Sequence, residues 1–277
     1  MLHEGYSYAV THRTGRTMTK YRSGIISAPT LNLSAGLAQR AFGFAAVTLV
    51  LFTLPGCQSI TGNPNVSEIR ILDASPDAPG LDLYQGTNIL AYNLGLGTIT
   101  SYVATTPGTY GIIADTAGTT KQLISAQATL LNGGQYTVVI GNYLNSLQEV
   151  IVKDQSTPAP SGQINVRFVD QSTRAGALDL YLVPSGSTLA TIKPVMTNIT
   201  FDVNSGYINI PTGTYTLMAL PTGTIPTAMS TTLYTGSSVT YSSGAARTFF
   251  LVDQQLITTP GVQVVIGDDY DSPTATS

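Results

Sequence analysis

From residue 67 onward the chain consists of short runs in which hydrophobic and polar residues alternate, and Gly, Pro and Asn separate the runs. Val, Ile, Thr and Tyr are frequent in these runs, and such side chains fit the pleated surface of a β-strand. Apolar residues at helical spacing never continue beyond a turn or two. The runs of the first part predict strands over residues 67–74, 81–84, 89–94, 98–104, 109–114, 121–130, 136–141 and 148–153. Short strands between frequent turns predict an antiparallel β-sandwich.

The alternation within residues 81–84 also predicts which side chains face the core. Successive side chains of a strand point to opposite faces of the sheet. Leu81 and Leu83 are therefore expected to point inward, whereas Asp82 and Tyr84 are expected on the outer face or rim.

Part of this pattern occurs twice. The run IRILDAS at residues 69–75 aligns with VRFVDQS at residues 166–172, and LDLY at residues 81–84 aligns with LDLY at residues 178–181. The shift is 97 residues in both cases, so the alignment has no gap. Self-similarity of this kind indicates a duplicated structural unit.

The later parts of the two copies match more loosely. Residues 107–110 (PGTY) correspond to residues 211–215 (PTGTY), and residues 136–139 (YTVV) correspond to residues 248–251 (TFFL). Residues 155–163, between the copies, are rich in Pro and Ser. Proline prevents a continuous helix or sheet ladder there, so this stretch is predicted to be a linker.

The sequence therefore predicts an all-β fold with two tandem antiparallel β-sandwich domains, immunoglobulin-like or transthyretin-like, after a signal peptide. The first domain is expected over residues 67–154 and the second over residues 164–270, and residues 271–277 are expected to form a tail.

The N-terminal region has a different pattern, in which basic residues precede an uncharged apolar run over residues 41–54. A bilayer span needs about 20 apolar residues, whereas the core of a signal peptide needs about 7–15. The run therefore predicts a signal peptide rather than a permanent transmembrane helix. Residues 1–17 lengthen its basic part unusually, so a start at Met18 is an alternative to Met1.

The only cysteine, Cys57, ends the sequence Leu54-Pro55-Gly56-Cys57, which resembles the lipobox of bacterial lipoproteins. The resemblance implies cleavage before Cys57 and attachment of a lipid to its thiol, although Pro55 departs from the usual pattern. A buried free thiol is the alternative, but Cys57 lies between an apolar run and a polar spacer, outside any strand pattern.

This resemblance predicts that residues 1–56 are a lipoprotein signal peptide and that residues 57–66 are a lipidated tether. The membrane is then a partner through the lipid anchor, and the protein is exported to the bacterial envelope. An Asp after the lipidated Cys retains Gram-negative lipoproteins at the inner membrane, and Gln58 resembles the outer-membrane pattern instead, if the source is Gram-negative.

Residues 71–84, ILDASPDAPGLDLY, resemble the opening signature of the domain-of-unknown-function family numbered 4397. That signature reads as a strand, His-Ala-Ser-Pro-Asp-Ala-Pro and an alternating Val-Asp-Val-Tyr. Residues 106–110 and 134–139 resemble two later elements of the family, Pro-Ala-Gly-Thr-Tyr and Gly-x-x-Tyr-Thr-Val. The resemblance implies an exported envelope protein with tandem copies, and the family has no established activity.

The resemblance covers most of residues 67–154 and, with fewer matches, residues 164–268. Asp73 stands where the family usually has His, and residues 173–176 (TRAG) replace Pro-Asp-Ala-Pro in the second copy. Any role of that loop in the first copy is therefore not carried over to the second.

Composition excludes one class of partner. Charged residues make up 10 % of the chain and hydrophobic residues 43 %, and seven basic residues face fourteen acidic ones beyond Cys57. Binding to phosphate backbones requires basic patches. Nucleic acid is therefore not an expected partner.

The mature protein also lacks the residues for histidine or thiol catalysis. His3 and His12 both precede the cleavage site, and Cys57 is expected to carry lipid. These losses exclude Ser-His-Asp and Cys-His catalysis and zinc sites built on His or Cys. No Gly-rich loop leads from a strand into a helix, so no nucleotide site and no cofactor are expected.

Carboxylate chemistry remains available, and Asp73, Asp77 and Asp82 are the candidate metal ligands. Oxygen ligands suit Ca²⁺, and paired carboxylates can hydrolyse glycosidic bonds, but the spacing is not that of an EF-hand loop. The pattern favours a structural role, in which Asp73 and Asp77 cap turns through their side chains.

Two further charge patterns allow more than one interpretation. Arg70 and Asp82, which recur as Arg167 and Asp179, are expected to form a cross-strand ion pair. The acidic stretch Asp268-Asp269-Tyr270-Asp271 is interpreted as a solvated end, with metal binding as the alternative.

Together these observations predict a non-catalytic, lipid-anchored envelope protein whose two β-sandwich modules serve surface structure, adhesion or complex assembly. The partner is expected to be an envelope protein or a polysaccharide, because exposed tyrosines can contact sugars or proteins. The alternatives are a carboxylate-dependent glycan hydrolase and a Ca²⁺-stabilised glycan-binding protein.

Overall fold

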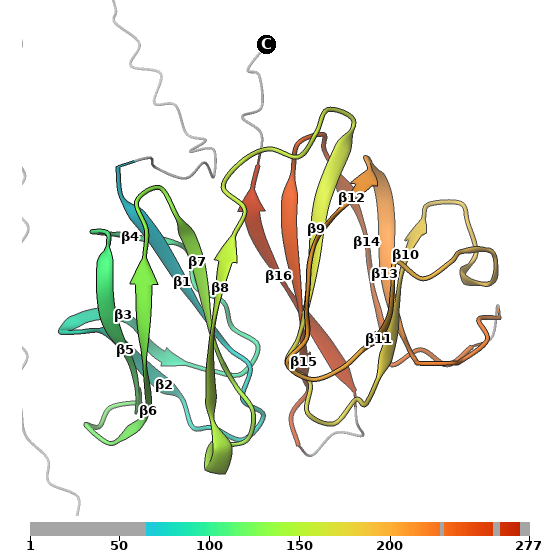
Figure 1. The fold of residues 1–277 in the computed structure, drawn as a ribbon. Helices are drawn as coiled ribbons and strands as arrows, with labels where there is room; N and C mark the ends of the chain where they lie inside the picture. Colours follow the sequence, from blue (N-terminus) through green and yellow to red (C-terminus); the bar gives the residue numbers. More distant parts are fainter. Residues whose placement is uncertain (1–64, 228–229, 257–260, 272–277) are drawn as a thin grey trace, which may run out of the picture. The chain divides into compact units, whose positions relative to one another are not determined.

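The computed structural model describes residues 65–227, 230–256 and 261–271, which are almost entirely β-structure (Figure 1). The first sandwich contains β1 (Ser67–Asp73), β2 (Leu81–Gln85), β3 (Asn88–Leu94), β4 (Val103–Thr105), β5 (Gly108–Thr116), β6 (Gln122–Leu130), β7 (Gln135–Gly141) and β8 (Gln148–Asp154). The second contains β9 (Gln163–Asp170), β10 (Leu178–Pro184), β11 (Met196–Ile199), β12 (Asn204–Pro211), β13 (Gly213–Pro221), β14 (Tyr234–Tyr241), β15 (Ala246–Asp253) and β16 (Val262–Tyr270).

Several predictions concern residues outside the described ranges. These are the signal peptide, the alternative start at Met18, the lipidation of Cys57, the tether up to residue 64 and the tail beyond residue 271. In the part of the chain that the structure describes, no helix has the length and apolar character needed to cross a membrane.

The all-β prediction is confirmed, and the strands form two β-sandwiches of two four-stranded sheets each. All but one of the strands predicted for the first copy occur within two residues of the expected ends. The exception is residues 98–104, where β4 begins only at Val103 and Ile99 makes a single bridge to Leu72. The ladder is interrupted because the Ile71 amide donates to the Thr100 side-chain hydroxyl over 3.0 Å.

Both sandwiches have the same topology. The first pairs a sheet in the order β4-β1-β7-β8 with one in the order β3-β2-β5-β6, and the second repeats these orders as β12-β9-β15-β16 and β11-β10-β13-β14. The expectation of purely antiparallel sheets is wrong in one respect, because β1 pairs with β7, and β9 with β15, in parallel. These strands are distant in sequence, and parallel pairing requires such a long connection.

Each sandwich has its own hydrophobic core. Leu81 and Leu83 point into the first core, as predicted, and their counterparts Leu178 and Leu180 point into the second. In the second core the rings of Phe168 and Phe249 stack with their centroids 5.3 Å apart.

The two sandwiches also pack against each other through their mixed sheets. Apolar side chains from the outward faces of both sheets form one further buried cluster, containing Leu72, Ala74, Val139, Val152, Val169, Phe250 and Val252. We call this contact the seam. Strands β1, β7, β9 and β15 are therefore almost completely buried on both faces.

Candidate functional site

Polar side chains also lie in the seam, and Arg70 on β1 is the first of them. Its guanidinium is almost completely buried. Nε donates to Thr137 Oγ1 over 2.8 Å within the same sandwich. Nη1 donates to the Asp268 carbonyl over 2.9 Å, and Nη2 donates to the Asp269 carboxylate, both in the other sandwich. The ring of Tyr102 lies 4.4 Å from the guanidinium carbon, which is a cation–π contact.

Arg167 on β9 has the same surroundings in the second sandwich. Nε donates to Thr248 Oγ1 over 3.0 Å. Nη1 donates to the Lys153 carbonyl over 2.8 Å, and Nη2 donates to the Asp154 carboxylate, both in the first sandwich. The ring of Tyr207 lies 4.5 Å from this guanidinium carbon. Each arginine thus makes its shortest ion pair with an aspartate of the other copy, and Arg70 Nη2 also lies 3.6 Å from Asp154 Oδ2 of its own copy.

The two aspartates complete the arrangement. Asp154 Oδ2 accepts hydrogen bonds from Thr137 over 2.6 Å and from Tyr102 over 2.8 Å. Asp269 Oδ2 likewise accepts hydrogen bonds from Thr248 over 2.7 Å and from Tyr207 over 2.8 Å. We call the eight side chains that recur in this way the seam network: Arg70, Tyr102, Thr137, Asp154, Arg167, Tyr207, Thr248 and Asp269.

The electrostatics of the network follow from its burial. Desolvation tends to lower the pKa of Arg70, but the carboxylates of Asp154 and Asp269 outweigh it and the pKa is raised. Burial first, and then the charge of Asp154, raise the pKa of Asp269 to about 6 against the opposing effect of Arg70 and Arg167. Burial is also the main reason why the pKa values of Tyr102 and Tyr207 are raised, so both remain neutral hydrogen-bond donors.

The seam network joins the two sandwiches through side-chain hydrogen bonds and ion pairs. Its arginines and aspartates are nearly inaccessible to solvent and already bonded to one another. A buried ion pair whose members have their hydrogen bonds satisfied fixes an arrangement, and removing one partner is costly. The network therefore holds the sandwiches in one orientation.

The predicted pairing of Arg70 with Asp82 is wrong. Asp82 accepts from the backbone amides of Asn93 and Gly118, both over 2.8 Å, and it is buried instead of lying at an open rim. Asp179 has the equivalent role in the second copy, accepting from the amides of Asn198 and Gly223. The sequence showed that the residues recur, but it could not show that the partner of each arginine comes from the other copy.

Asp73 and Asp77, the other members of the predicted carboxylate group, bond to different backbone amides from those that Asp82 binds. Asp73 accepts from the Ser75 amide over 2.9 Å, and Asp77 accepts from the Leu144 amide over 2.7 Å. Among the residues that the structure describes, no three His, Cys, Asp or Glu side chains are placed to hold a metal ion. Asp73 thus caps its own turn as expected, whereas Asp77 bonds to the connection between β7 and β8, 67 residues away.

Asp73 and its counterpart Asp170 share one unusual property. One carboxylate oxygen of each is buried and makes no hydrogen bond. Burial raises the pKa of Asp73 to about 7 and that of Asp170 to about 6, in spite of hydrogen bonds from Ser75 and Ser172. Both carboxyl groups are therefore easier to protonate than an exposed aspartate.

The acidic stretch at residues 268–271 is more ordered than a solvated end. Asp269 belongs to the seam network, and Asp268 Oδ1 lies 2.7 Å from Arg247 Nε. Asp271 pairs with the same arginine through Nη2. The stretch thus joins the seam to a half-exposed ion-pair group on the second sandwich.

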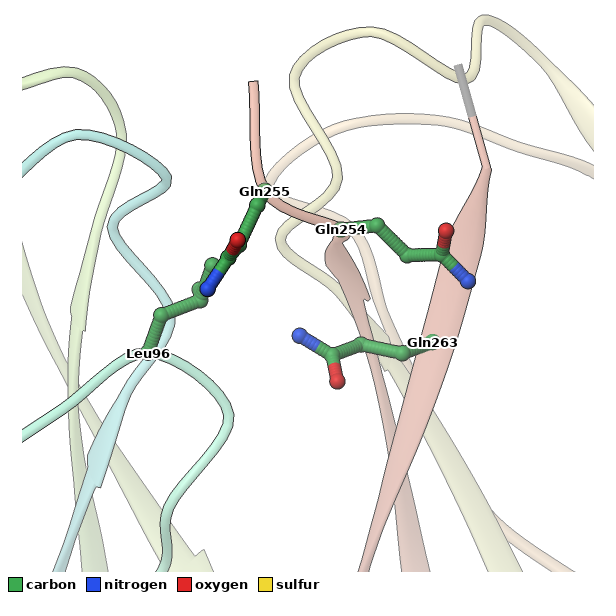
Figure 2. Close-up of a pocket in the computed structure, with 4 residues that line it drawn as sticks. All are labelled: Leu96, Gln254, Gln255 and Gln263. Carbon is green, nitrogen blue, oxygen red and sulfur yellow. The ribbon is translucent and has the colours of Figure 1, made fainter. Parts of the chain in front are cut away.

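A hollow of about 300 Å³ opens near one end of the seam, where Leu96, Gln254, Gln255 and Gln263 line it (Figure 2). Gln263 Nε2 donates to the Asp253 carbonyl over 3.0 Å, which fixes this amide. Amide side chains can both donate and accept hydrogen bonds without carrying charge. Three of the four side chains that line the hollow are therefore polar and uncharged.

Several members of the seam network were not found from the sequence. Thr137 and Thr248 pair in register with Arg70 and Arg167, respectively, so they are equivalent positions. The loose alignment had instead placed Tyr136 opposite Thr248, one residue away from the true register. A shift of one residue exchanges the two faces of a strand, which hid the recurring threonine.

Comparison with known proteins gives one family match. Residues 67–181 match the model of the family described as "Domain of unknown function (DUF4397)". The match covers the first sandwich and continues into β10 of the second. None of the curated proteins matches the chain.

Two solved structures are similar in part. One is the carbohydrate-binding module CBMbc, of family CBM26, from Eubacterium rectale Amy13K in complex with maltoheptaose, with 13% identity, a TM-score of 0.23, and coverage of 74% of this chain and 100% of that chain. The other is reported under "Alpha-glucan binding by a streptococcal virulence factor", with 12% identity, a TM-score of 0.23, and coverage of 66% of this chain and 92% of that chain.

Proposed function

We propose that this chain is an exported, lipid-anchored protein of the bacterial envelope that presents its two β-sandwiches as one rigid, non-catalytic module for surface structure, adhesion or complex assembly. The anchor in this proposal is Cys57, on the strength of the lipobox-like sequence before it. The module is the pair of sandwiches joined through the seam.

The observation that carries the proposal is the reciprocal bonding of the seam network. Arg70 bonds to Asp269, and Arg167 bonds to Asp154, so each copy neutralises a buried charge of the other. The recurring polar residues of the duplication therefore serve the joining of the copies. A rigid two-sandwich block on a tether is suited to presenting a surface at a distance from the membrane.

The acids considered for catalysis support the same proposal. Asp77 and Asp82 each accept hydrogen bonds from backbone amides that belong to other turns of the first sandwich. Bonds of this kind stabilise the loops in which those amides lie. A structural role explains these side chains without a hydrolytic reaction.

Anchoring is tested by labelling cells with a palmitate analogue and fractionating them. We expect the full-length protein to be labelled and to sediment with membranes. Cys57→Ser is expected to lose the label and to move to the soluble fraction, because several acyl chains provide the stable anchoring. Ser59→Ala, two residues further on, is the matched control and should behave as the wild type.

Full membrane association of Cys57→Ser would instead indicate an uncleaved membrane helix.

The catalytic alternative has its own test. Asp77→Asn and Asp82→Asn, made singly, should leave binding of envelope material intact, whereas a carboxylate hydrolase would lose turnover by orders of magnitude at one of them.

A further inference from the structure

The outer faces of the two equivalent sheets β3-β2-β5-β6 and β11-β10-β13-β14 differ sharply in exposure. Tyr84 on β2 and Tyr181 on β10 occupy the same position of the duplicated Leu-Asp-Leu-Tyr sequence. Tyr181 is 2% exposed, whereas Tyr84 is only half-buried. The same surface is therefore closed in one copy and open in the other.

The second copy closes its face with a segment of its own. Residues 185–195 connect β10 to β11, and Leu189 and Ile192 of this connection pack on Tyr181. Val183, Met218 and Leu220 complete that cluster. The equivalent connection in the first copy is the turn Gly86-Thr87, which has two residues where the second copy has eleven and lacks the apolar side chains that cover Tyr181.

The uncovered surface, which we call the open face, runs across all four strands of the first sheet. Tyr84 is in register with Ile89 on β3 and with Ile113 on β5, and Ile113 is in register with Ser125 on β6. Residues in register point to the same face. Tyr92 extends this row, and its side chain is 65% exposed.

The chemistry of the open face differs from that of its closed counterpart at one informative position. Asp115 is in register with Asp82 in the first copy, and Leu220 is in register with Asp179 in the second. The apolar contact made by Leu220 is thus replaced by a carboxylate. Apolar side chains placed over it, as Leu189 and Ile192 are placed in the second copy, would remove that carboxylate from water without compensation, which is costly.

The other side chains of the open face are suited to binding a ligand rich in hydroxyls. Partial burial raises the pKa of Tyr84, and Asp82, Tyr92 and Asp115 add to this effect because their side chains lie near the phenol. Two tyrosine rings beside carboxylates disfavour an anionic ligand. A pyranose ring has a C–H face that packs on an aromatic ring and hydroxyls at its rim that bond to carboxylates and hydroxyls.

We propose that the open face binds a neutral glycan, whose sugar rings pack on Tyr84 and Tyr92 and whose hydroxyls bond to Asp115 and Ser125. The second sandwich, with its face closed by residues 185–195, serves as the rigid support. This inference deepens the proposed function, since it names a polysaccharide as the partner of the anchored module and gives the surface that binds it.

The test is calorimetric titration of the full-length protein in detergent with maltoheptaose, cellohexaose and chitohexaose. At least one of these neutral probes should bind saturably, and the anionic polymer polygalacturonate should not. We expect Tyr92→Ala to weaken binding about tenfold, because it removes one of the two aromatic rings on which the sugar rings pack. Asp115→Leu, which reproduces the closed counterpart, should weaken binding to a similar degree.

Two control variants, each altered outside the open face, show whether a loss of binding is specific to that face. Tyr143→Ala removes a half-buried tyrosine from the connection between β7 and β8, and Ile225→Ala removes a side chain that is 82% exposed on the second sandwich. Both should bind the same probe with the affinity of the wild type. Circular dichroism should show that Tyr92→Ala and Asp115→Leu remain folded.

The inference is overturned if no neutral probe binds, or if Tyr92→Ala and Asp115→Leu bind as well as the wild type. Capture of an envelope protein that depends on Tyr92, without binding of any probe, would also overturn it and would assign the open face to a protein partner. Palmitate labelling at Cys57 is independent of these outcomes, so the anchoring proposal would stand.

Discussion

Arg70 on the first sandwich and Asp269 on the second, 199 residues apart in the chain, form a buried charge-assisted hydrogen bond across the seam. Arg167 and Asp154 form the corresponding bond in the opposite direction. A surface that supplies both members of each pair is self-complementary, as in a two-fold symmetric dimer interface. Here the two halves of that interface belong to one duplicated chain.

The first prediction concerns the loss of one arginine. Arg70→Met should lower the free energy of unfolding by about 3–5 kcal/mol, because the buried carboxylates of Asp154 and Asp269 then have only Arg167 as a positive partner. Urea unfolding followed by circular dichroism measures the change. Lys121→Met, at an exposed position of the first sandwich, is the control and should change stability by less than about 0.5 kcal/mol. An equally small effect of Arg70→Met would show that the seam is not held by this pair.

The second prediction tests whether Arg70 and Asp269 act as a pair. The double variant Arg70→Met with Asp269→Asn should be more stable than the sum of the single effects predicts, by about 1–3 kcal/mol, since it removes both buried charges. The same urea experiment on four proteins gives this coupling energy. Pairing Arg70→Met with Asp179→Asn, whose contacts are in another part of the second sandwich, should give additive effects.

Sequence patterns predicted much of this fold because its strands obey local rules. Leu81 and Leu83 point inward as their alternation requires, and strand ends follow the turn residues closely. The parallel pairing of β1 with β7 was not predictable in this way, because it depends on which distant strand completes the sheet. The partner of Arg70 was hidden for the same reason, since no local pattern shows that two sheets pack face to face.

The third prediction concerns the buried loop contacts of Asp82. Asp82→Ala removes the two partly buried hydrogen bonds that the amides of Asn93 and Gly118 donate to this carboxylate, and a hydrogen bond to a charged group contributes about 1.5–3 kcal/mol. Thermal unfolding should therefore show a clear loss of stability. Asp82→Asn keeps one acceptor oxygen and should lose roughly half as much. If Asp82 were instead a ligand for Ca²⁺, addition of Ca²⁺ would stabilise the wild type and not Asp82→Ala.

The fourth prediction concerns the dependence of stability on pH, for which Asp73 is the clearest probe. Burial raises its pKa in the folded protein to about 7, above the value of about 3.9 expected in the unfolded chain. Between these values the folded state binds more protons than the unfolded state, so Asp73 lowers stability as the pH rises through this window. Below about pH 4 the group is protonated in both states and this loss vanishes.

Asp73→Asn should remove this contribution, because the amide is neutral at every pH and can still accept from the Ser75 amide. The wild type should therefore lose stability relative to Asp73→Asn between about pH 4 and pH 7, at about 1.4 kcal/mol per pH unit. Glu149, Asp170 and Asp269 also have raised pKa values, but they are present in both proteins and cancel in the difference. Urea unfolding of both proteins at half-unit pH intervals measures it. A difference that stays constant across the window, or that changes in the opposite direction, would show that the carboxyl group of Asp73 ionises in the folded protein as readily as an exposed one.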